Sequence, residues 1–397
     1  MSAPLRIALV AGEESGDQLG AALMDGLRER ARRPVAFSGV GGTRMAARGL
    51  HSEFPMSEVS ITGITAIISG LPAIVRRVHQ TVAAVIAADP AALVIIDSPE
   101  FTHAVAKRVR RRAPHIPILD YVSPQVWAWR AGRARRMRAY VDRVLAILPF
   151  EPQVHRRLGG PDCVYVGHPL IERAAGLRSG SGERAELGPG VTPTLLVLPG
   201  SRMSEVSRLM DVFGETLARL QQEGRSFEAV LPAVPHLRSE IEARASAWPV
   251  VPTLVEGEEA KWAAFRQAHA ALAASGTVTL ELALAGVPQV VAYRLDWVYR
   301  RLNRLRLRFP SLSGISTIVL ANIVMGRNAV PEFIEAEANP AALAAALGPL
   351  LRSSAERDAQ IAAYAGLWSA MALPDGAPPS LAAADAVLEL AGERGRG

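Results

Sequence analysis

Two turns in the second half of the chain combine residue types that suit a phosphate group. The first contains Gly200, Ser201 and Arg202, and it lies between the apolar run 195–198 and a helix-like pattern. A strand, a tight turn and a helix start aim backbone N–H groups, the positive helix end and a guanidinium at one point. The turn therefore predicts a phosphate site, and an ordinary strand-to-helix turn is the alternative.

The second turn contains Ser275, Gly276 and Thr277, and it follows the small-residue run 270–274. Its two hydroxyl groups lie at another helix start, which suits a diphosphate. Glu281 lies about one helical turn further on. Its carboxylate could accept hydrogen bonds from ribose hydroxyl groups, or it could only complement the helix dipole.

Asp97 is the first candidate for acid–base chemistry. It follows the continuous apolar run 93–96. Open α/β sheets place working groups where a buried parallel strand ends, so Asp97 could act as a general base. Because Pro99 is typical of a first helical turn, a helix cap is the alternative.

Glu13 and Asp17 are two further acidic candidates. They lie in a loop after the apolar run 5–10, ahead of an amphipathic helix. The loop lacks a phosphate-binding glycine pattern, and its acidic residues would repel a phosphate. It better suits sugar hydroxyl groups, or a helix cap formed by Ser15 or Asp17.

An aromatic and basic corner follows the expected strand at residues 117–121. Gln125, Trp129 and Arg130 lie in it, and further arginines extend to residue 138. This corner could bind an anionic group. A solvated helix face is the alternative.

An apolar segment at residues 59–79 is rich in Ile, is broken by Gly63, Gly70 and Pro72, and ends in basic residues. It is too short and too interrupted to span a bilayer. Either it forms a packed helix pair, or it presents an apolar surface with a basic edge to a membrane interface. The candidate membrane and acyl-chain contacts are Ile64, Ile67, Ile68, Leu71, Val75, Arg76 and Arg77.

Strand-like and helix-like patterns alternate on both sides of a Gly-, Ser- and charge-rich segment, residues 178–193. We interpret that segment as a linker between two doubly wound α/β domains. The length of 397 residues agrees, because it exceeds the usual limit for one hydrophobic core.

Composition narrows the class of protein. The net charge of +6 and the isoelectric point near 9.9 indicate anionic partners, but the aromatic residues do not form an RNA-type stacking pattern. The single cysteine excludes an internal disulfide framework and any multi-cysteine metal site, and it fits a reducing compartment. The chain start does not have the pattern of a signal peptide, and no stretch is long and apolar enough for a transmembrane helix.

The motifs together resemble those of one family, the lipid-A-disaccharide synthases. They occur in order over residues 5–335, which is most of the chain. The matching segments are VAGEESGD, GVGG, IIDSPEF, YVSPQVWAWR, LPFE, VGHP, LPGSR, ASGTVTLELALAGVP and ANIVMGR.

The resemblance implies a GT-B glycosyltransferase, with two Rossmann-like domains facing across a cleft and a C-terminal helix crossing back. The N-terminal acceptor and membrane domain would comprise residues 1–175 and about 365–397, and the UDP-sugar domain residues 176–364. The family transfers 2,3-diacylglucosamine from its UDP derivative to 2,3-diacylglucosamine 1-phosphate, forming lipid A disaccharide 1-phosphate and UDP. The resemblance further implies a homodimer on the cytoplasmic face of the inner membrane, without a nucleic-acid partner.

For the site, the resemblance assigns Asp97 as the base that deprotonates the acceptor 6-hydroxyl group, with Glu13 or Asp17 orienting the sugar or acting instead. UDP would contact both turns and Glu281, and Asn322 would contact the donor. Gln125, Trp129 and Arg130 become candidates for the acceptor phosphate. No DxD motif occurs, so we expect neither a metal requirement nor a cofactor. Because both substrates carry acyl chains, membrane contact is now the favoured interpretation of residues 61–79.

Two kinds of alternative remain. The chain could be a related GT-B enzyme, either a UDP-N-acetylglucosamine transferase with another lipid acceptor or a UDP-sugar epimerase. The apolar segment argues against the epimerase. The chain could also be a non-catalytic nucleotide-binding module at the membrane.

Overall fold

The computed structural model describes residues 3–60, 64–127, 131–173, 176–180, 182–294 and 317–392, without the side chains of residues 64–71. The chain forms two compact units. The first comprises residues 1–172 and 371–397, and the second residues 173–370. The sequence predicted these divisions at residues 175/176 and 364/365.

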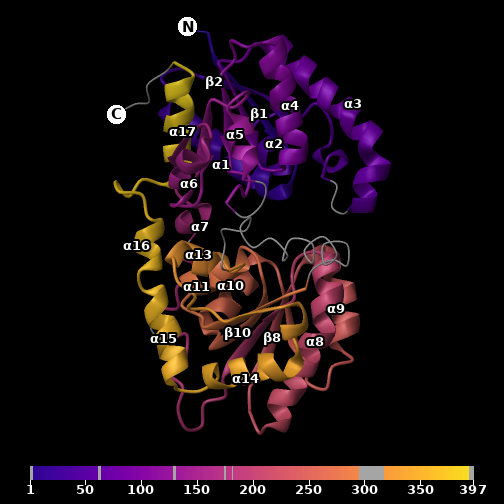
Figure 1. Ribbon diagram of the computed structural model, residues 1–397, viewed down its shortest axis with the longest axis vertical. Coiled ribbons are helices and arrows are strands. Elements are labelled where there is room, and N and C mark those ends of the chain that lie inside the picture. The colour runs from indigo at the N-terminus through magenta and orange to yellow at the C-terminus, as the bar shows by residue number, and fades with distance from the viewer. Residues whose placement is uncertain are drawn as a thin grey trace. The chain divides into compact units, whose positions relative to one another are not determined.

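A six-stranded parallel sheet forms the centre of the first unit, with strand order β2-β1-β3-β4-β5-β6 (Figure 1). Strand β3 is buried along its whole length, which is why its sequence is a continuous apolar run. The strands are β1 (Leu5–Ala11), β2 (Val35–Val40), β3 (Ala92–Ile96), β4 (Ile118–Tyr121), β5 (Arg143–Ala146) and β6 (Asp162–Tyr165).

Helices cover both faces of this sheet. One hydrophobic cluster joins it to α1 and α17, and a second joins it to α3, α4 and α5. The helices are α1 (Glu14–Arg30), α2 (Thr43–Ala46), α3 (Ile64–Ala88), α4 (Pro99–Arg112), α5 (Gly132–Met137), α6 (Glu151–Leu158), α7 (Pro169–Glu172) and α17 (Pro379–Leu390), with the 3-10 turn η1 (Met56–Glu58).

Helix α17 returns the chain to the first unit by packing on α1. The two helices approach so closely at Gly26 that a Cβ atom there would lie 2.7 Å from the carbonyl oxygen of Ser380. An ion pair from Arg30 to Asp385 also joins the two helices, and one from Arg143 to Glu389 joins α17 to β5. A glycine is therefore needed at this crossing.

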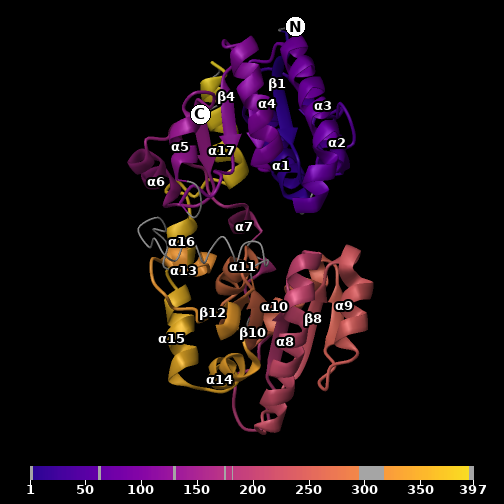
Figure 2. The same cartoon turned by 45° about the vertical axis from the view of Figure 1, so that its right-hand side comes forward.

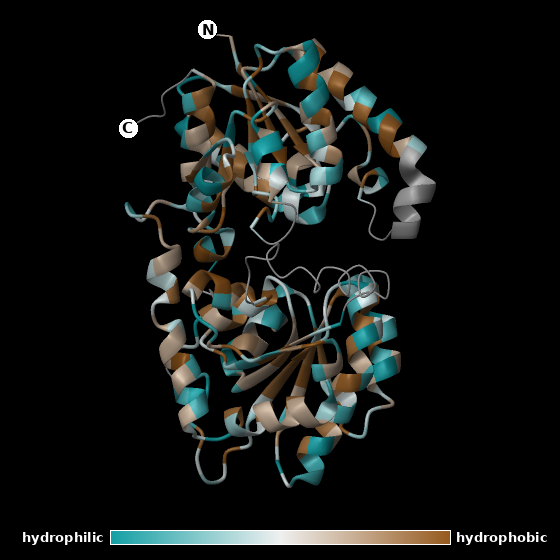
Figure 3. Ribbon diagram, in the orientation of Figure 1, coloured by the Kyte–Doolittle hydropathy of each residue, from teal (hydrophilic) through white to brown (hydrophobic). Residues whose placement is uncertain are grey.

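The second unit has its own six-stranded parallel sheet, with strand order β12-β11-β10-β7-β8-β9 (Figure 2). Its strands are apolar, as the hydropathy colouring shows (Figure 3). The strands are β7 (Thr194–Leu198), β8 (Glu228–Ala233), β9 (Thr253–Glu256), β10 (Ala270–Ala274), β11 (Gln289–Tyr293) and β12 (Glu332–Ile334).

One cluster packs α8, α9 and α14 on this sheet, and α10 and α11 also contact its strands. The helices are α8 (Met203–Gln222), α9 (Arg238–Ala245), α10 (Glu258–Gln267), α11 (Val278–Leu284), α13 (Leu320–Met325), α14 (Pro340–Leu350), α15 (Ala355–Tyr364) and α16 (Leu367–Met371), with the 3-10 turns η3 (Pro235–Leu237) and η5 (Glu335–Glu337).

Each sheet has one switch point, where the chain changes the direction in which it adds strands. The switch lies between β1 and β3 in the first unit and between β7 and β10 in the second. In open α/β sheets, ligands bind beyond the carboxyl ends of the strands at such a point. In each unit, the candidate site therefore comprises the two loops that follow these strands.

Two details of local structure differ from what the sequence suggested. The helix pair that was one alternative for residues 59–79 does not form, because residues 64–88 are one helix, α3, which continues through Pro72. The predicted linker belongs to the second unit, because Arg184 donates hydrogen bonds to the carbonyl groups of Phe265, Ala285 and Gly286. None of the helices in the described ranges is long and apolar enough to cross a membrane.

Candidate active site

The loops after β1 and β3 pack directly against each other. Ser15 Oγ, at the start of α1, donates a hydrogen bond of 2.8 Å to Asp97 Oδ2, just beyond β3. A Cβ atom at Gly12 would lie 2.8 Å from the Cβ atom of Ser98. The first switch point therefore brings the acidic loop and Asp97 together.

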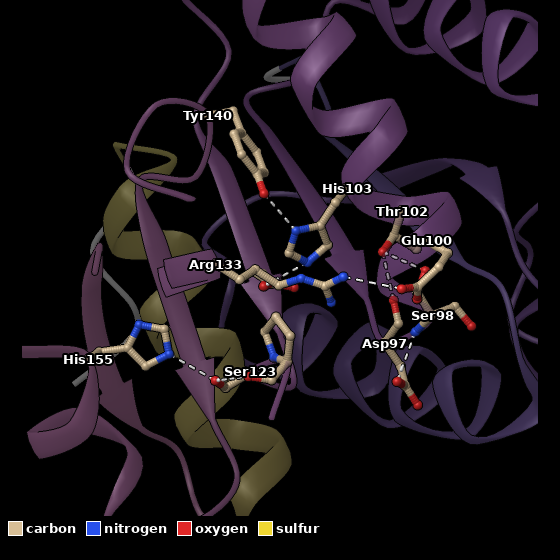
Figure 4. Close-up of polar contacts among 11 residues, drawn as sticks. Asp97, Ser98, Glu100, Thr102, His103, Ser123, Arg133, Tyr140 and His155 are labelled. Atoms are coloured by element: carbon tan, nitrogen blue, oxygen red, sulfur yellow. Dashed lines mark hydrogen bonds and ion pairs between the residues drawn. The ribbon is translucent and has the colours of Figure 1, made fainter. Parts of the chain in front are cut away.

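The backbone around Asp97 is strained and held by hydrogen bonds. Asp97 and Ser98 both adopt left-handed conformations, with φ of 52° and 43°. The hydroxyl group of Thr102 donates to the carbonyl oxygen of Asp97 at 2.7 Å, and the Ser98 N–H donates to Asp97 Oδ1 at 2.8 Å (Figure 4). Such strain is typical of functional sites, and here it fixes a half-buried carboxylate at the sheet edge.

Asp17 caps a helix, which is one of the two roles that the sequence left open for it. Its carboxylate is 2% exposed and accepts the backbone N–H groups of Gly42 at 2.7 Å, Arg44 at 2.9 Å and Met45 at 3.1 Å. These groups belong to the N-terminus of α2, so Asp17 caps a helix other than its own.

Glu13 remains a candidate, since it is half-buried and its carboxylate makes no hydrogen bond or ion pair within the described part of the chain. On the acceptor side, Gln125 is exposed, and Trp129 and Arg130 lie outside the described residues. His168 is a turn residue. Its Nδ1 accepts the Leu170 N–H at 3.1 Å, and burial lowers the pKa of His168 to about 4.

The second switch point brings the two predicted phosphate turns to neighbouring strands. Gly200 to Arg202 follow β7, and Ser275 to Thr277 follow β10. Gly200 has a φ of +123°, which favours glycine. The Arg202 side chain is 60% exposed. The arrangement presents a guanidinium and two backbone turns at one sheet edge, as a diphosphate site requires.

Glu205 is a residue of this turn that sequence reasoning missed. Its Oε2 accepts the N–H groups of Ser201 at 3.0 Å and Arg202 at 3.3 Å, and its Oε1 lies 3.2 Å from Arg202 Nη1. A carboxylate thus lies where the turn would hold an anion. The signal in the sequence was a glutamate at the third helical position, a typical partner of a helix start.

The turn after β10 leaves its tip open. Gly276 and Thr277 are exposed, and their N–H groups donate to no acceptor among the residues that the structure describes. Ser275 Oγ donates to the carbonyl oxygen of Ile318 at 2.8 Å. The backbone of the tip can therefore bind a ligand anion, while the serine hydroxyl anchors the turn.

Glu281 and Asn322 have partners within the protein. Glu281 Oε2 lies 2.5 Å from Lys261 Nζ, so any ribose contact would share this carboxylate. Asn322 is 1% exposed, and its Oδ1 accepts the N–H groups of Ala329 and Val330 at 3.0 and 2.9 Å. The amide of Asn322 therefore holds the turn after α13, and its assignment to the donor stays a prediction.

The candidate membrane surface is described only in part. Val75 is 42% exposed and Arg76 is exposed on α3. Arg77 pairs with Glu58 at 2.6 Å and lies 4.8 Å from the centre of the Phe54 ring, so it is held within the protein. The side chains of Ile64, Ile67, Ile68 and Leu71 lie outside the described residues.

Two doubly wound parallel sheets, each with candidate ligand-binding turns at its switch point, define a two-domain protein with the GT-B fold. Solved structures agree with this fold. A Staphylococcus aureus MnaA–UDP structure has a TM-score of 0.62 at 12% identity and covers 98% of both chains. Acinetobacter baumannii MurG has a TM-score of 0.55 at 13% identity, covering 92% of this chain and 95% of its own.

Sequence comparison identifies the family. A family model described as lipid-A-disaccharide synthetase matches residues 7–365. Lipid-A-disaccharide synthase of Bradyrhizobium diazoefficiens is 52% identical over 383 residues, 96% of each chain. The enzyme of Nitrobacter winogradskyi is 53% identical over 388 residues, 97% of this chain and 95% of its own. The chain belongs to the lipid-A-disaccharide synthase family, a family of glycosyltransferases.

Proposed function

We propose that this chain transfers 2,3-diacylglucosamine from UDP-2,3-diacylglucosamine to 2,3-diacylglucosamine 1-phosphate, with inversion at the anomeric carbon. Family membership supports the reaction class. The observation that carries the chemistry is the Asp97 carboxylate, which Ser15 holds at the first switch point. UDP and lipid A disaccharide 1-phosphate are the products.

In this mechanism, Asp97 removes the proton from the acceptor 6-hydroxyl group while that oxygen attacks the donor anomeric carbon. The bond from this carbon to the diphosphate oxygen breaks, and UDP leaves with the electron pair. Arg202 and the N–H groups of Gly276 and Thr277 stabilise the developing charge. Glu13 orients the sugar through its hydroxyl groups.

We propose further that the protein acts as a homodimer on the cytoplasmic face of the inner membrane. Both substrates carry acyl chains, and α3 presents the apolar Val75 beside the cationic Arg76. Such a surface binds anionic lipid through apolar contact and charge. Val75→Glu should weaken sedimentation with anionic vesicles, whereas Ile361→Glu, an exposed apolar position of the second unit, should not. Equal behaviour of the two variants contradicts this surface, and light scattering tests the dimer.

A mass-spectrometric transfer assay with the two purified acyl sugars tests the reaction. Asp97→Asn should lower turnover at least ~100-fold, because it removes the base, while UDP binding remains. Normal turnover removes Asp97 from this role. Epimerised UDP-N-acetylglucosamine, formed without acceptor, would instead favour the epimerase alternative.

Calorimetry tests the UDP site separately. Arg202→Ala should weaken UDP binding by about 1.5–3 kcal/mol, as expected for a lost hydrogen bond to a charged group. Arg219→Ala on α8, the helix that Arg202 precedes, is the matched control, because this exposed arginine pairs with Glu223 one turn away at 3.1 Å. Equal affinity of both variants places the diphosphate elsewhere.

A further inference from the structure

The loop after β4, residues 122–127, is a second strained segment beside Asp97. Strand β4 neighbours β3, and the Asp97 N–H donates to the carbonyl oxygen of Tyr121 at 3.1 Å. The next residue, Val122, has a φ of +79°. A β-branched residue seldom adopts this conformation, so the surrounding structure must hold the loop.

The first anchor of this β4 loop is a buried hydrogen bond between Ser123 and His155. Ser123 Oγ lies 2.8 Å from His155 Nε2 (Figure 4). Ser123 is 3% exposed and His155 is fully buried. Because burial lowers the pKa of His155, its imidazole is neutral at physiological pH and provides a hydrogen bond without a charge.

The second anchor is formed by Trp127 and Glu151. Trp127 Nε1 donates to Glu151 Oε1 at 3.1 Å, and the Leu148 N–H donates to Glu151 Oε2 at 3.0 Å. The Trp127 ring also packs edge-on against Phe150, with ring centres 5.4 Å apart. One buried carboxylate therefore joins the end of the β4 loop to the segment that precedes α6.

Both anchors come from one face of α6, since Glu151 and His155 are four positions apart. They hold the loop at Ser123 and at Trp127, and the exposed Gln125 lies between these points. Glu151 and His155 are themselves 2% and 0% exposed. They cannot contact a substrate, so any functional effect must act through the loop.

We propose that Glu151 and His155 are positioning residues that hold the β4 loop in the shape that presents Gln125 to the acceptor sugar phosphate. This inference rests on the proposed function, because it assigns the loop to the acceptor. It predicts that loosening either anchor raises the KM for the acceptor and leaves UDP binding unchanged, since UDP is assigned to the second unit.

The anchor at Glu151 is sensitive to pH. Burial raises the pKa of Glu151 to about 7, and the carboxylate of Asp120 on β4 adds to this effect. The thiol of Cys163 and the phenol of Tyr165 also interact with Glu151, from β6. A carboxylate accepts both N–H groups, whereas the protonated acid turns one oxygen into a donor. The loop should therefore be held less firmly below about pH 7.

Kinetics of the full-length enzyme test the positioning role. Glu151→Gln should raise the acceptor KM about tenfold, because that is the fold-change expected when one charged hydrogen bond is weakened. The Kd for UDP should stay unchanged within about twofold. Ser123→Ala should act in the same direction through the other anchor. The matched control is Thr81→Val on α3, away from the loop. It removes a buried hydroxyl group that donates to the backbone carbonyl oxygen of Arg77.

The indole N–H signal of Trp127 gives a readout that needs no substrate. It is assigned with Trp127→Phe in ¹⁵N-labelled protein. The signal should titrate near pH 7 in the wild type and stay constant in Glu151→Gln. A wild-type signal that does not change with pH overturns the proposal. An acceptor KM that is unchanged in both Glu151→Gln and Ser123→Ala also overturns it. Absence of transfer in the wild type contradicts the proposed function instead, while the indole titration still tests the anchor.

Discussion

Changing Asp17 to its amide should lower stability, whereas changing Asp97 to its amide should lower turnover. The Asp17 carboxylate accepts three backbone N–H groups in a site that is 2% exposed. Asp17→Asn keeps Oδ1, which accepts from Gly42 and Met45. It replaces Oδ2 with an NH₂ group that faces the Arg44 N–H, so one charged hydrogen bond becomes a contact between two donors.

The expected loss in the free energy of unfolding is about 2–4 kcal/mol, from one lost charged hydrogen bond and a buried donor left without an acceptor. For a unit of this size, this corresponds to a fall in melting temperature of roughly 5–15 °C. Asp97→Asn should melt near the wild-type temperature, because Asp97 is half-buried and has no comparable set of backbone donors.

Differential scanning calorimetry and the transfer assay at 25 °C measure the two effects on the same samples. Asp25→Asn on the same helix is the control, because its ion pairs with Arg28 and Arg48 are exposed and should contribute at most about 1 kcal/mol. Wild-type melting of Asp17→Asn together with a loss of turnover of ~100-fold would refute the structural role of Asp17.

Three further predictions concern stability, the donor site and metal. The pKa of Glu151 is raised to about 7 in the folded state, so between pH 4.5 and about 7 the folded state keeps a proton that the unfolded state has released. The free energy of unfolding should therefore fall by roughly 3 kcal/mol as the pH rises through this range. Urea titrations at pH 5 and 8 should show this change in the free energy of unfolding in the wild type and not in Glu151→Gln. An equal change in both proteins contradicts the prediction. Asn322→Ala should lower the melting temperature of the second unit and leave the UDP Kd unchanged in calorimetry, and the reverse pattern would place Asn322 at the donor site. EDTA should leave transfer unchanged, because Arg202 and backbone N–H groups are the proposed partners of the leaving group; a loss that magnesium restores would show a metal requirement.

The order of apolar runs and turns in the sequence predicted the α/β class and the doubly wound sheets, and the family resemblance implied the GT-B fold. Strand-to-helix turns are local, so the sequence also placed Asp97, Arg202 and Ser275 in the turns that follow strands. Parallel strands end at the same edge of a sheet, and this rule brings such turns together without knowledge of their contacts. The motifs added the family, which the comparisons confirmed.

Only the tertiary structure decided which polar groups are partners. Ser15 and Asp97 are 82 residues apart, and Asp17 caps a helix 25 residues beyond it. Glu281 lies beside Lys261, and the Asn322 side chain accepts a hydrogen bond from the Val330 N–H. A buried polar group must find a partner, but the partner depends on strand order and on how closely the helices pack. Local periodicity contains neither, so the sequence identified the chemical groups, and the fold determined which of them remain available to a substrate.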